Sequence, residues 1–281
     1  MTTLLELQHV NKRYENGTLA LQDVDLAIGE REFVSLLGPS GCGKSTALKM
    51  MASLLPLTSG TIEWSEKTVH PKPVEGLKAS TLRQAQGRPS SARTDISSHA
   101  KDISFVFQEP TLMPWAVVFD NVWLPLRLKG LSKEAARPQV DEALAKVGLA
   151  QFAHVYPREL SGGMKMRVSI ARAMVTEPRL LLMDEPFAAL DEMTRFKLNN
   201  DTLNLWKAKQ FTTVFVTHSV YESVYLSNRI IIMAARPGRM IADIAIDEPY
   251  PRTDAFRNTE RYAQLCVKVS QELQKAGEHH V

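Results

Sequence analysis

The segment from Gly38 to Thr46 constrains this chain more than any other. It reads Gly-Pro-Ser-Gly-Cys-Gly-Lys-Ser-Thr, which matches the pattern G-x-x-x-x-G-K-[ST] of phosphate-binding loops. The apolar run before it, residues 32–37, is typical of a strand buried on both faces, and residues 44–55 after it carry a helical apolar stripe. This order predicts the first half of a parallel α/β unit whose connecting loop binds phosphate.

Each part of this loop has an expected role toward a nucleoside triphosphate. The glycines let successive backbone N–H groups turn toward an anion, and the helix N-terminus adds roughly half a positive charge. We expect Lys44 to bridge the β- and γ-phosphates and the Ser45 hydroxyl to bind Mg²⁺. The candidate nucleotide-binding residues of the loop are Gly38, Pro39, Ser40, Gly41, Cys42, Gly43, Lys44, Ser45 and Thr46.

Two carboxylates form the second candidate part of the site. Asp184 and Glu185 directly follow the apolar run at residues 180–183, which is the arrangement called Walker B. We expect Asp184 to hold Mg²⁺ and Glu185 to orient and deprotonate an attacking water. Taken alone, the pair also fits a role in capping a helix. Its occurrence together with the phosphate loop favours the magnesium and water roles.

A further glycine-containing segment, Leu160-Ser161-Gly162-Gly163, precedes a helical pattern that runs to about residue 176. Ser161 is a favourable N-cap, and two glycines leave the first N–H groups of the helix open to an oxyanion. Capping alone accounts for the serine but not for the glycines, which weaken a helix start. We therefore predict that Ser161, Gly162 and Gly163 contact an anionic ligand.

The hydrophobic pattern predicts one α/β domain over residues 1–281. Apolar runs at 103–107, 180–183, 213–216 and 229–233 are typical of buried parallel strands, whereas 5–10, 20–28 and 240–246 alternate as antiparallel strands do. Strand patterns give way to helical ones from residue 110. We expect a mostly parallel core sheet, an antiparallel β subdomain, an inserted helical subdomain at about 110–177 and a C-terminal helix at about 254–276.

Residues 72–101 differ from the rest in composition. They hold six basic and two acidic residues, have few aromatics and are rich in Ser, Ala, Gln, Gly and Pro. We interpret them as an inserted, flexible surface loop. A lengthened surface loop costs only about 0.6 kcal/mol per doubling, so we expect folding to tolerate it.

Composition excludes several classes of protein. The formal charge is +3, from 34 basic and 31 acidic residues, which is too small for nucleic-acid binding through a generally basic surface. Two cysteines, Cys42 and Cys266, cannot build a disulfide framework and indicate a reducing compartment. We found no apolar run near the roughly 18–20 residues that cross a bilayer.

With these motifs in this order, the chain resembles the ATP-binding-cassette (ABC) ATPases, which are P-loop NTPases, over nearly its whole length apart from residues 72–101. By this resemblance Tyr14 stacks on adenine, and Gln108 contacts both Mg²⁺ and the attacking water. His218 contacts the γ-phosphate, and residues 188–191, Ala-Ala-Leu-Asp, form the D-loop. Met164 and Ala188 stand where glutamine and serine are common in the family. Neither replaces a group that touches phosphate, so we expect activity to survive both.

The resemblance also implies partners. ABC ATPases form head-to-tail dimers in which ATP and Mg²⁺ lie between the phosphate loop of one chain and the Ser161–Gly163 segment of the other. The region from Gln108 to Trp115 would contact transmembrane permease subunits, and a periplasmic solute-binding protein would act indirectly. The chain would then be a peripheral ATPase, a translocase subunit, on the cytoplasmic face of a bacterial inner membrane.

A finer resemblance concerns direction and solute. The sequences FQEPTLMPWAVVFDNVWLPL and SNRIIIMAARPGRM are similar to the ATPases of nitrate, sulfonate and taurine importers. This favours an importer of a small anionic solute. An exporter, an importer of another solute such as a pyrimidine precursor, and a cassette disabled by its insertion remain as alternatives. Chromosome-organising ATPases are disfavoured because no sustained heptads separate Thr46 from Ser161.

Overall fold

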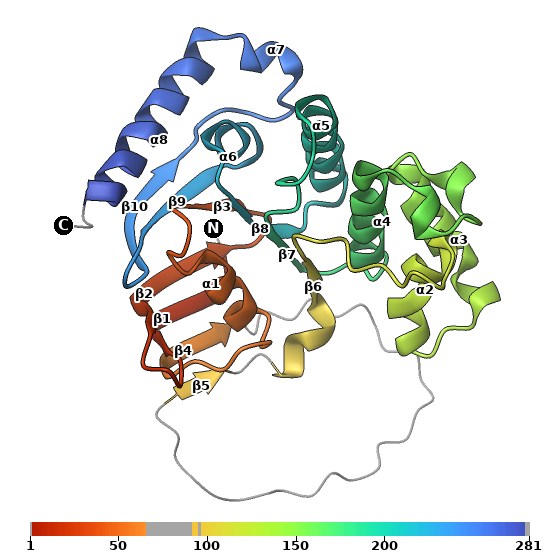
Figure 1. The fold of residues 1–281 in the computed structure, drawn as a ribbon, viewed down its shortest axis with the longest axis horizontal. Helices are drawn as coiled ribbons and strands as arrows, with labels where there is room; N and C mark the ends of the chain where they lie inside the picture. The colour runs from red at the N-terminus through yellow and green to blue at the C-terminus, as the bar shows by residue number, and fades with distance from the viewer. Residues whose placement is uncertain (1, 66–91, 95–96, 279–281) are drawn as a thin grey trace, which may run out of the picture.

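The computed structural model describes residues 2–65, 92–94 and 97–278 of the chain (Figure 1). Two sheets and a group of helices make up these residues. Of the predicted insertion, residues 72–91 and 95–96 lie outside the described residues. No helix of the described chain combines the length and the apolar character that a membrane crossing needs.

The central sheet has six strands in the order β10-β9-β3-β8-β7-β6. All neighbours pair in parallel except β10, which runs antiparallel to β9. Every residue of β3, β7 and β8 is buried, which explains why these strands are mostly apolar and do not alternate between apolar and polar residues. Their bounds are β3 (Phe33–Leu37), β6 (Ile103–Val106), β7 (Leu180–Asp184), β8 (Thr212–Thr217), β9 (Arg229–Ala234) and β10 (Arg239–Ala245). The predicted parallel core is confirmed.

The second sheet has the order β2-β1-β4-β5. Its strands are β1 (Thr3–Arg13), β2 (Leu19–Gly29), β4 (Ser59–Trp64) and β5 (Ala92–Thr94). The predicted antiparallel strands at 5–10 and 20–28 pair here, in β1 and β2. The third predicted strand, 240–246, is also antiparallel but lies in the central sheet as β10, because it pairs with β9.

Helices α2 (Val118–Leu128), α3 (Lys133–Lys146) and α4 (Gly162–Met174) gather beside the β6 and β7 edge of the central sheet, away from the second sheet (Figure 1). In α3 the positions Ala136, Val140 and Leu144 are buried, as their spacing predicts. Two short 3₁₀ turns, Ala150–Phe152 and Pro157–Glu159, lie between α3 and α4. The helical elements therefore occupy the range in which we expected an inserted helical subdomain.

The remaining helices are α1 (Lys44–Met51), α5 (Glu192–Lys209), α6 (Val220–Leu226), α7 (Asp254–Arg257) and α8 (Glu260–Glu278). Helix α1 ends earlier than the predicted residue 55, because Ser53 adopts a left-handed φ of 56°. The predicted C-terminal helix is two helices. Thr259 separates them, since its hydroxyl accepts a hydrogen bond from Tyr262 N at the start of α8.

The end of the predicted insertion is structured. Strand β5, at residues 92–94, pairs in parallel with β4, and a 3₁₀ turn at Ser97–Asp102 leads into β6. The His99 ring stacks on Trp64 with 4.9 Å between the ring centroids. The boundary that we placed at residue 101 is therefore corrected: the chain is built into the second sheet from residue 92.

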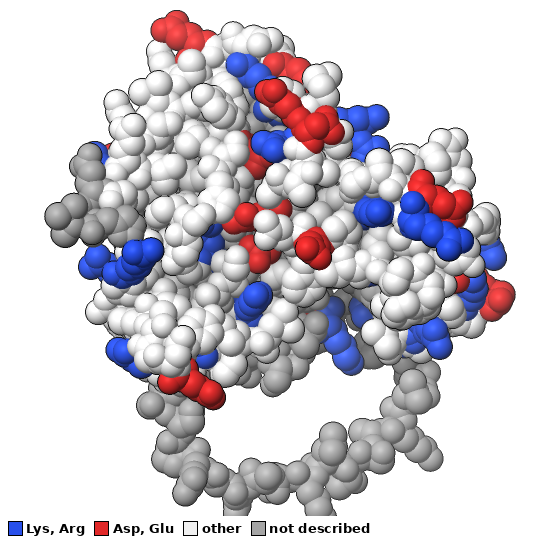
Figure 2. Space-filling view, viewed as in Figure 1, with Lys and Arg blue, Asp and Glu red and all other residues white. Residues whose placement is uncertain are grey.

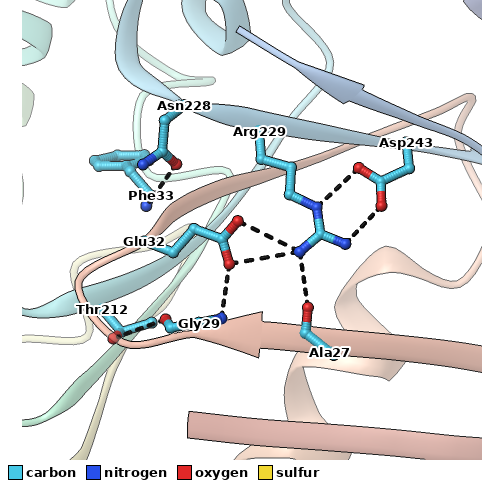
Figure 3. A network of polar contacts seen from close by, with 8 residues as sticks. All are labelled: Ala27, Gly29, Glu32, Phe33, Thr212, Asn228, Arg229 and Asp243. Atoms are coloured by element: carbon cyan, nitrogen blue, oxygen red, sulfur yellow. Dashed lines mark hydrogen bonds and ion pairs between the residues drawn. The ribbon is translucent and has the colours of Figure 1, made fainter. Parts of the chain in front are cut away.

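A polar network around Arg229 joins the two sheets (Figure 3). Its Nε donates to Asp243 Oδ1 on β10 at 2.8 Å, and its Nη1 donates to Ala27 O on β2 at 2.8 Å. Nη1 also lies 3.3 Å from Glu32 Oε1, and Glu32 Oε2 accepts a hydrogen bond from Gly29 N at 2.7 Å. The hydrogen bond to Asp243 raises the pKa of the Arg229 guanidinium, which stays charged.

Replacing this arginine should destabilise the fold. Arg229→Met leaves the Glu32 carboxylate, whose side chain is 7% exposed, without its cation. We expect the free energy of unfolding in urea to fall by roughly 2–3 kcal/mol, since the penalty of an unpaired, largely buried charge is large. The control is Lys146→Met, which removes an exposed i,i+4 ion pair with Glu142 and should leave the unfolding midpoint unchanged. Equal midpoints for the two variants would contradict a joining role for Arg229.

Candidate functional site

The phosphate loop lies between the buried strand β3 and the start of α1. Gly41 and Gly43 have φ values of 78° and 92°, a region that side chains rarely allow. At Gly43 an added Cβ would lie 2.5 Å from Leu21 Cδ2 and 2.9 Å from Ala20 O, so no side chain fits there. The loop therefore packs directly against β2, and the backbone conformation depends on these glycines.

The Lys44 ammonium is placed inside the loop. The side chain is 5% exposed, and Nζ donates to Gly38 O at 2.9 Å and to Pro39 O at 3.0 Å. Cys42 is fully buried beside it, with Sγ 3.6 Å from Nζ. Burial raises the pKa of the Cys42 thiol, so this side chain stays neutral at neutral pH. Cys42 thus belongs to the loop through its backbone, while its side chain packs.

The Ser45 hydroxyl, at the start of α1, and the Asp184 carboxylate, at the end of β7, lie side by side. Ser45 Oγ donates to Asp184 Oδ1 at 2.8 Å, which joins α1 to the last residue of β7. Asp184 is 8% exposed. A hydroxyl and a carboxylate in contact are the hard oxygen donors that Mg²⁺ prefers. Two of the three predicted metal-binding residues, Ser45 and Asp184, are therefore in contact.

Glu185 and His218 form a close pair at the end of the central sheet. His218 Nε2 lies 2.5 Å from Glu185 Oε1, and its Nδ1 lies 3.3 Å from Gly38 O in the loop. Glu185 has a left-handed φ of 47°, and its N–H donates to Val216 O on β8 at 3.0 Å. A non-glycine residue in this region is strained, and such strain is common at functional sites. The fold thus holds this carboxylate at the phosphate loop.

Tyr14 stands at the entrance of the loop. Its hydroxyl lies 3.2 Å from Thr46 Oγ1, and the ring is 38% exposed. Lys12 Nζ lies 5.3 Å from the ring centroid, in a cation–π contact, and donates to Pro56 O at 2.7 Å. Tyr14 therefore offers an exposed aromatic face beside the phosphate loop.

These groups surround one hollow of about 550 Å³. Its lining residues are Tyr14, Thr18, Leu19, Ala20, Ser40, Gly41, Gly43, Lys44, Ser45, Thr46, Glu185, His218 and Arg236. Acidic side chains gather near the middle of this face of the molecule, around the ends of β7 and β8, with basic side chains about them (Figure 2). Residues 18–20 and Arg236 were not among the site residues predicted from the sequence. A turn after β9 brings Arg236 to the rim, and no local pattern signals such a long-range approach.

Two predicted parts of the site lie elsewhere in the described chain. Gln108 follows β6 by two residues, is exposed, and is not part of the lining of the hollow. Ser161 caps α4 by accepting a hydrogen bond from Met164 N at 3.3 Å, and it too is exposed. Gly162 is exposed, while Gly163 is buried against Thr194. The helix end that we expected to contact an anion therefore does not line the hollow of its own chain.

Comparison with known proteins identifies the family. Residues 21–188 match the family model described as ABC transporter. The chain is 40% identical over 257 residues to an aliphatic sulfonates import ATP-binding protein of Bacillus licheniformis. The aligned region covers 92% of this chain and 88% of that protein.

Solved structures agree. The fold matches cbiO1 of Clostridium perfringens, described as part of the ABC transporter complex cbiONQ, with a TM-score of 0.72, 25% identity, and coverage of 96% of this chain and 100% of that chain. It also matches a dimeric ATP-binding cassette bound to ADP and Pi, described as a post-hydrolysis state. That match has a TM-score of 0.69, 32% identity, and coverage of 88% and 100%. This chain therefore belongs to the ABC transporter family, as an ATP-binding subunit with the P-loop fold and ATPase activity.

Proposed function

We propose that this chain is the ATPase subunit of a bacterial importer for a small anionic solute. ATP hydrolysis by this chain is supported chiefly by the contact between Glu185 and His218. His218 Nδ1 also contacts Gly38 O, which places both side chains beside the phosphate loop. The 40% identity to a sulfonate-import ATPase supports the direction and the class of solute. A cassette disabled by its insertion is disfavoured, because the loop, Asp184, Glu185 and His218 come together.

The binding steps follow from the positions of the side chains. The loop N–H groups and the α1 N-terminus would bind the phosphates, and Lys44 would turn from its carbonyl partners to the β- and γ-phosphates. Tyr14 would stack on the adenine ring through its exposed face. Ser45 and Asp184 fit Mg²⁺ as a pair, and Gln108 would join them after a movement of its segment. The bound metal would neutralise charge on the phosphates.

In the hydrolytic step Glu185 is the proton acceptor. Glu185 would orient a water molecule in line with the γ-phosphate and accept its proton as the water oxygen bonds to phosphorus. The bond from phosphorus to the β–γ bridging oxygen would break in the same step, and ADP would leave with that oxygen. His218 would hold Glu185 through Nε2 and contact the γ-phosphate oxygens. The contact with His218 holds the Glu185 carboxylate before substrate arrives, so little reorganisation is needed.

A second copy of the chain would complete the site. The Ser161–Gly163 segment, at the N-terminus of α4, does not line the hollow of its own chain, and its residues Ser161 and Gly162 are exposed. In a head-to-tail dimer this helix end would lie over the γ-phosphate of the partner and exclude water from it. Hydrolysis would then place like-charged products in the interface and loosen the dimer.

Membrane partners would dock on the segment that precedes α2. This docking segment (residues 108–115) ends in Trp115, whose side chain is 77% exposed. An exposed tryptophan at the end of a short irregular segment is suited to bind a helix of a permease subunit. The chain would then be a peripheral subunit on the cytoplasmic face of the inner membrane. A periplasmic binding protein would deliver the solute, which this chain would not touch.

The docking assignment predicts a loss of assembly. Trp115→Ala should lower at least tenfold the amount of permease that co-purifies with the tagged chain from detergent-solubilised membranes, because a central aromatic anchor is lost. The matched control is Leu128→Ala, which removes an apolar side chain that is 80% exposed at the end of α2. Normal assembly of the Trp115 variant would place the docking surface elsewhere.

Transport direction and solute need a separate experiment. The purified complex is placed in proteoliposomes with ATP on the side of the ATPase subunits, and a solute-loaded binding protein is added on the other side. We expect solute to move toward the ATP side, with aliphatic sulfonates stimulating ATP hydrolysis more than pyrimidines do. Movement away from the ATP side would indicate an exporter and overturn the proposal.

A further inference from the structure

The docking segment has neither helix nor strand, yet the buried side chain of Asn121 and the half-buried side chain of Arg172 hold it. Asn121 of α2 is fully buried, and its Oδ1 accepts a hydrogen bond from Met113 N at 2.7 Å. Its Nδ2 donates to Ala116 O at 3.0 Å and also contacts Met113 O and Val117 O at 3.2 Å. One amide thus fixes the second half of the segment to α2.

Arg172 of α4 holds the first half. Its Nη1 donates to Thr111 O at 2.9 Å, and its Nη2 donates to Pro110 O and to Thr111 Oγ1, each at 2.9 Å. Burial lowers the pKa of the Arg172 guanidinium, although an arginine remains charged in proteins. No ion pair of the described residues includes Arg172. Its guanidinium N–H groups instead donate hydrogen bonds to uncharged oxygens of the docking segment.

Thr111 shows that this contact holds a strained conformation. Its φ is 46°, a left-handed value that is a genuine outlier for a β-branched residue. Such a conformation costs on the order of 1–3 kcal/mol and persists only where the surroundings enforce it. Arg172 bonds to both the carbonyl and the hydroxyl of this residue. Without the guanidinium, the segment has a lower-energy backbone conformation available.

The other end of α4 carries the Ser161–Gly163 segment. Helix α4 spans Gly162–Met174, 13 residues, which is a rigid rod of about 20 Å. Ser161 caps its first turn, and Arg172 lies in its last. A displacement of the docking segment that is transmitted through Arg172 therefore moves the helix end that we placed over the γ-phosphate of a second chain.

We propose that Arg172 is the positioning residue that couples the docking segment to the Ser161–Gly163 segment. Arg172 does not line the hollow. It fixes Pro110 and Thr111 to α4, so that the permease contact and the dimer contact move as one body. The proposal rests on the proposed docking of a permease on residues 108–115 and deepens it by naming the coupling residue.

The positioning claim is tested on the full chain alone by hydrogen–deuterium exchange. Arg172→Met should make the amides of residues 108–116 exchange at least tenfold faster, and Arg172→Lys should recover part of the protection because one ammonium keeps some of the contacts. The control is Arg167→Met on the same helix. Arg167 is 13% exposed and pairs with Asp201 of α5 at 3.1 Å. Unchanged exchange in Arg172→Met, or an equal rise in both variants, would overturn the claim.

The coupling claim is tested on the membrane complex. We expect Arg172→Met to assemble normally and to lower the kcat of permease-stimulated ATP hydrolysis about tenfold, with KM for ATP within twofold. Arg167→Met should retain wild-type stimulation, and Arg172→Lys should be intermediate. Wild-type stimulation in Arg172→Met would overturn the coupling role even if its segment exchanges faster.

The exchange experiment and the assay on the membrane complex distinguish failure of the Arg172 coupling role from failure of the proposed transporter function. If the wild-type chain neither assembles with membrane subunits nor is stimulated by them, the proposed function fails, and the coupling role falls with it. The exchange arm needs no partner and still decides whether Arg172 fixes the segment.

Discussion

Glu185→Gln should bind ATP normally and hydrolyse it at least about 100-fold more slowly. The amide keeps the size of the carboxylate and the contact with His218 but cannot accept the proton of the attacking water, and general-base catalysis is worth about 10²–10⁴ in rate. The measurement is kcat for ATP hydrolysis together with the Kd for ATP from equilibrium binding. We expect kcat to fall and Kd to stay within twofold.

A matched substitution shows whether the effect belongs to this carboxylate. Glu177→Gln removes an exposed glutamate, 72% exposed at its side chain, that pairs with Lys209. It should leave both kcat and Kd unchanged. Near-normal turnover in Glu185→Gln would remove Glu185 from its role as the base, whereas a large rise in Kd would indicate that the carboxylate mainly shapes the binding site.

Lys44→Ala should raise the Kd for ATP about 30- to 100-fold. The Lys44 ammonium is enclosed in the loop by Gly38 O and Pro39 O, so it has the position to meet the phosphates with little loss of conformational entropy. A charge-assisted hydrogen bond to phosphate contributes roughly 1.5–3 kcal/mol, and 1.4 kcal/mol corresponds to a factor of ten. Isothermal titration calorimetry with ATP and Mg²⁺ gives the change in affinity.

Lys49→Ala is the control for this variant. Lys49 lies on the same helix and carries the same charge, but its side chain is exposed and does not line the hollow. Its Kd should remain close to that of the wild type. An unchanged Kd in Lys44→Ala, or equal changes in the two variants, would contradict the assignment of residues 38–46 as the phosphate loop.

The local sequence predicts the elements whose geometry is local. The order of strand, glycine-rich loop and helix around Lys44 is found as expected, because short-range sterics and hydrogen bonding determine it. The same holds for the N-cap at Ser161 and for the fully buried strands β3, β7 and β8. In each case the residues whose pattern predicts the element are the same residues that are buried in it or that cap it.

Features that depend on packing between distant segments could not be predicted. Strand β10 alternates like the strands of the second sheet, and only its pairing with β9 places it in the central one. Arg236 reaches the hollow because Gly238 packs so closely that an added Cβ would lie 2.2 Å from Cys42 O. The contacts of Arg172 with Thr111 span 61 residues of sequence. The periodicity of apolar residues in the sequence does not predict contacts between residues so far apart.

We expect two copies of this chain to hold ATP between the phosphate loop of one and the Ser161–Gly163 segment of the other. Glu185→Gln should therefore form an ATP-dependent dimer, and adding Ser161→Arg to it should abolish that dimer, because the bulky cation blocks the helix end. A head-to-tail arrangement makes a sharper prediction about mixed chains, since each site draws its two halves from different chains.

The decisive measurement mixes two defective chains in the Glu185→Gln background, one with Lys44→Ala and one with Ser161→Arg, and determines mass and bound ATP by light scattering with nucleotide analysis. In a mixed dimer one site carries both defects and the other carries none. We predict that neither chain dimerises alone and that the mixture forms dimers with one ATP each. Only monomers in the mixture, or dimers of either defective chain alone, would contradict a head-to-tail site shared by two chains.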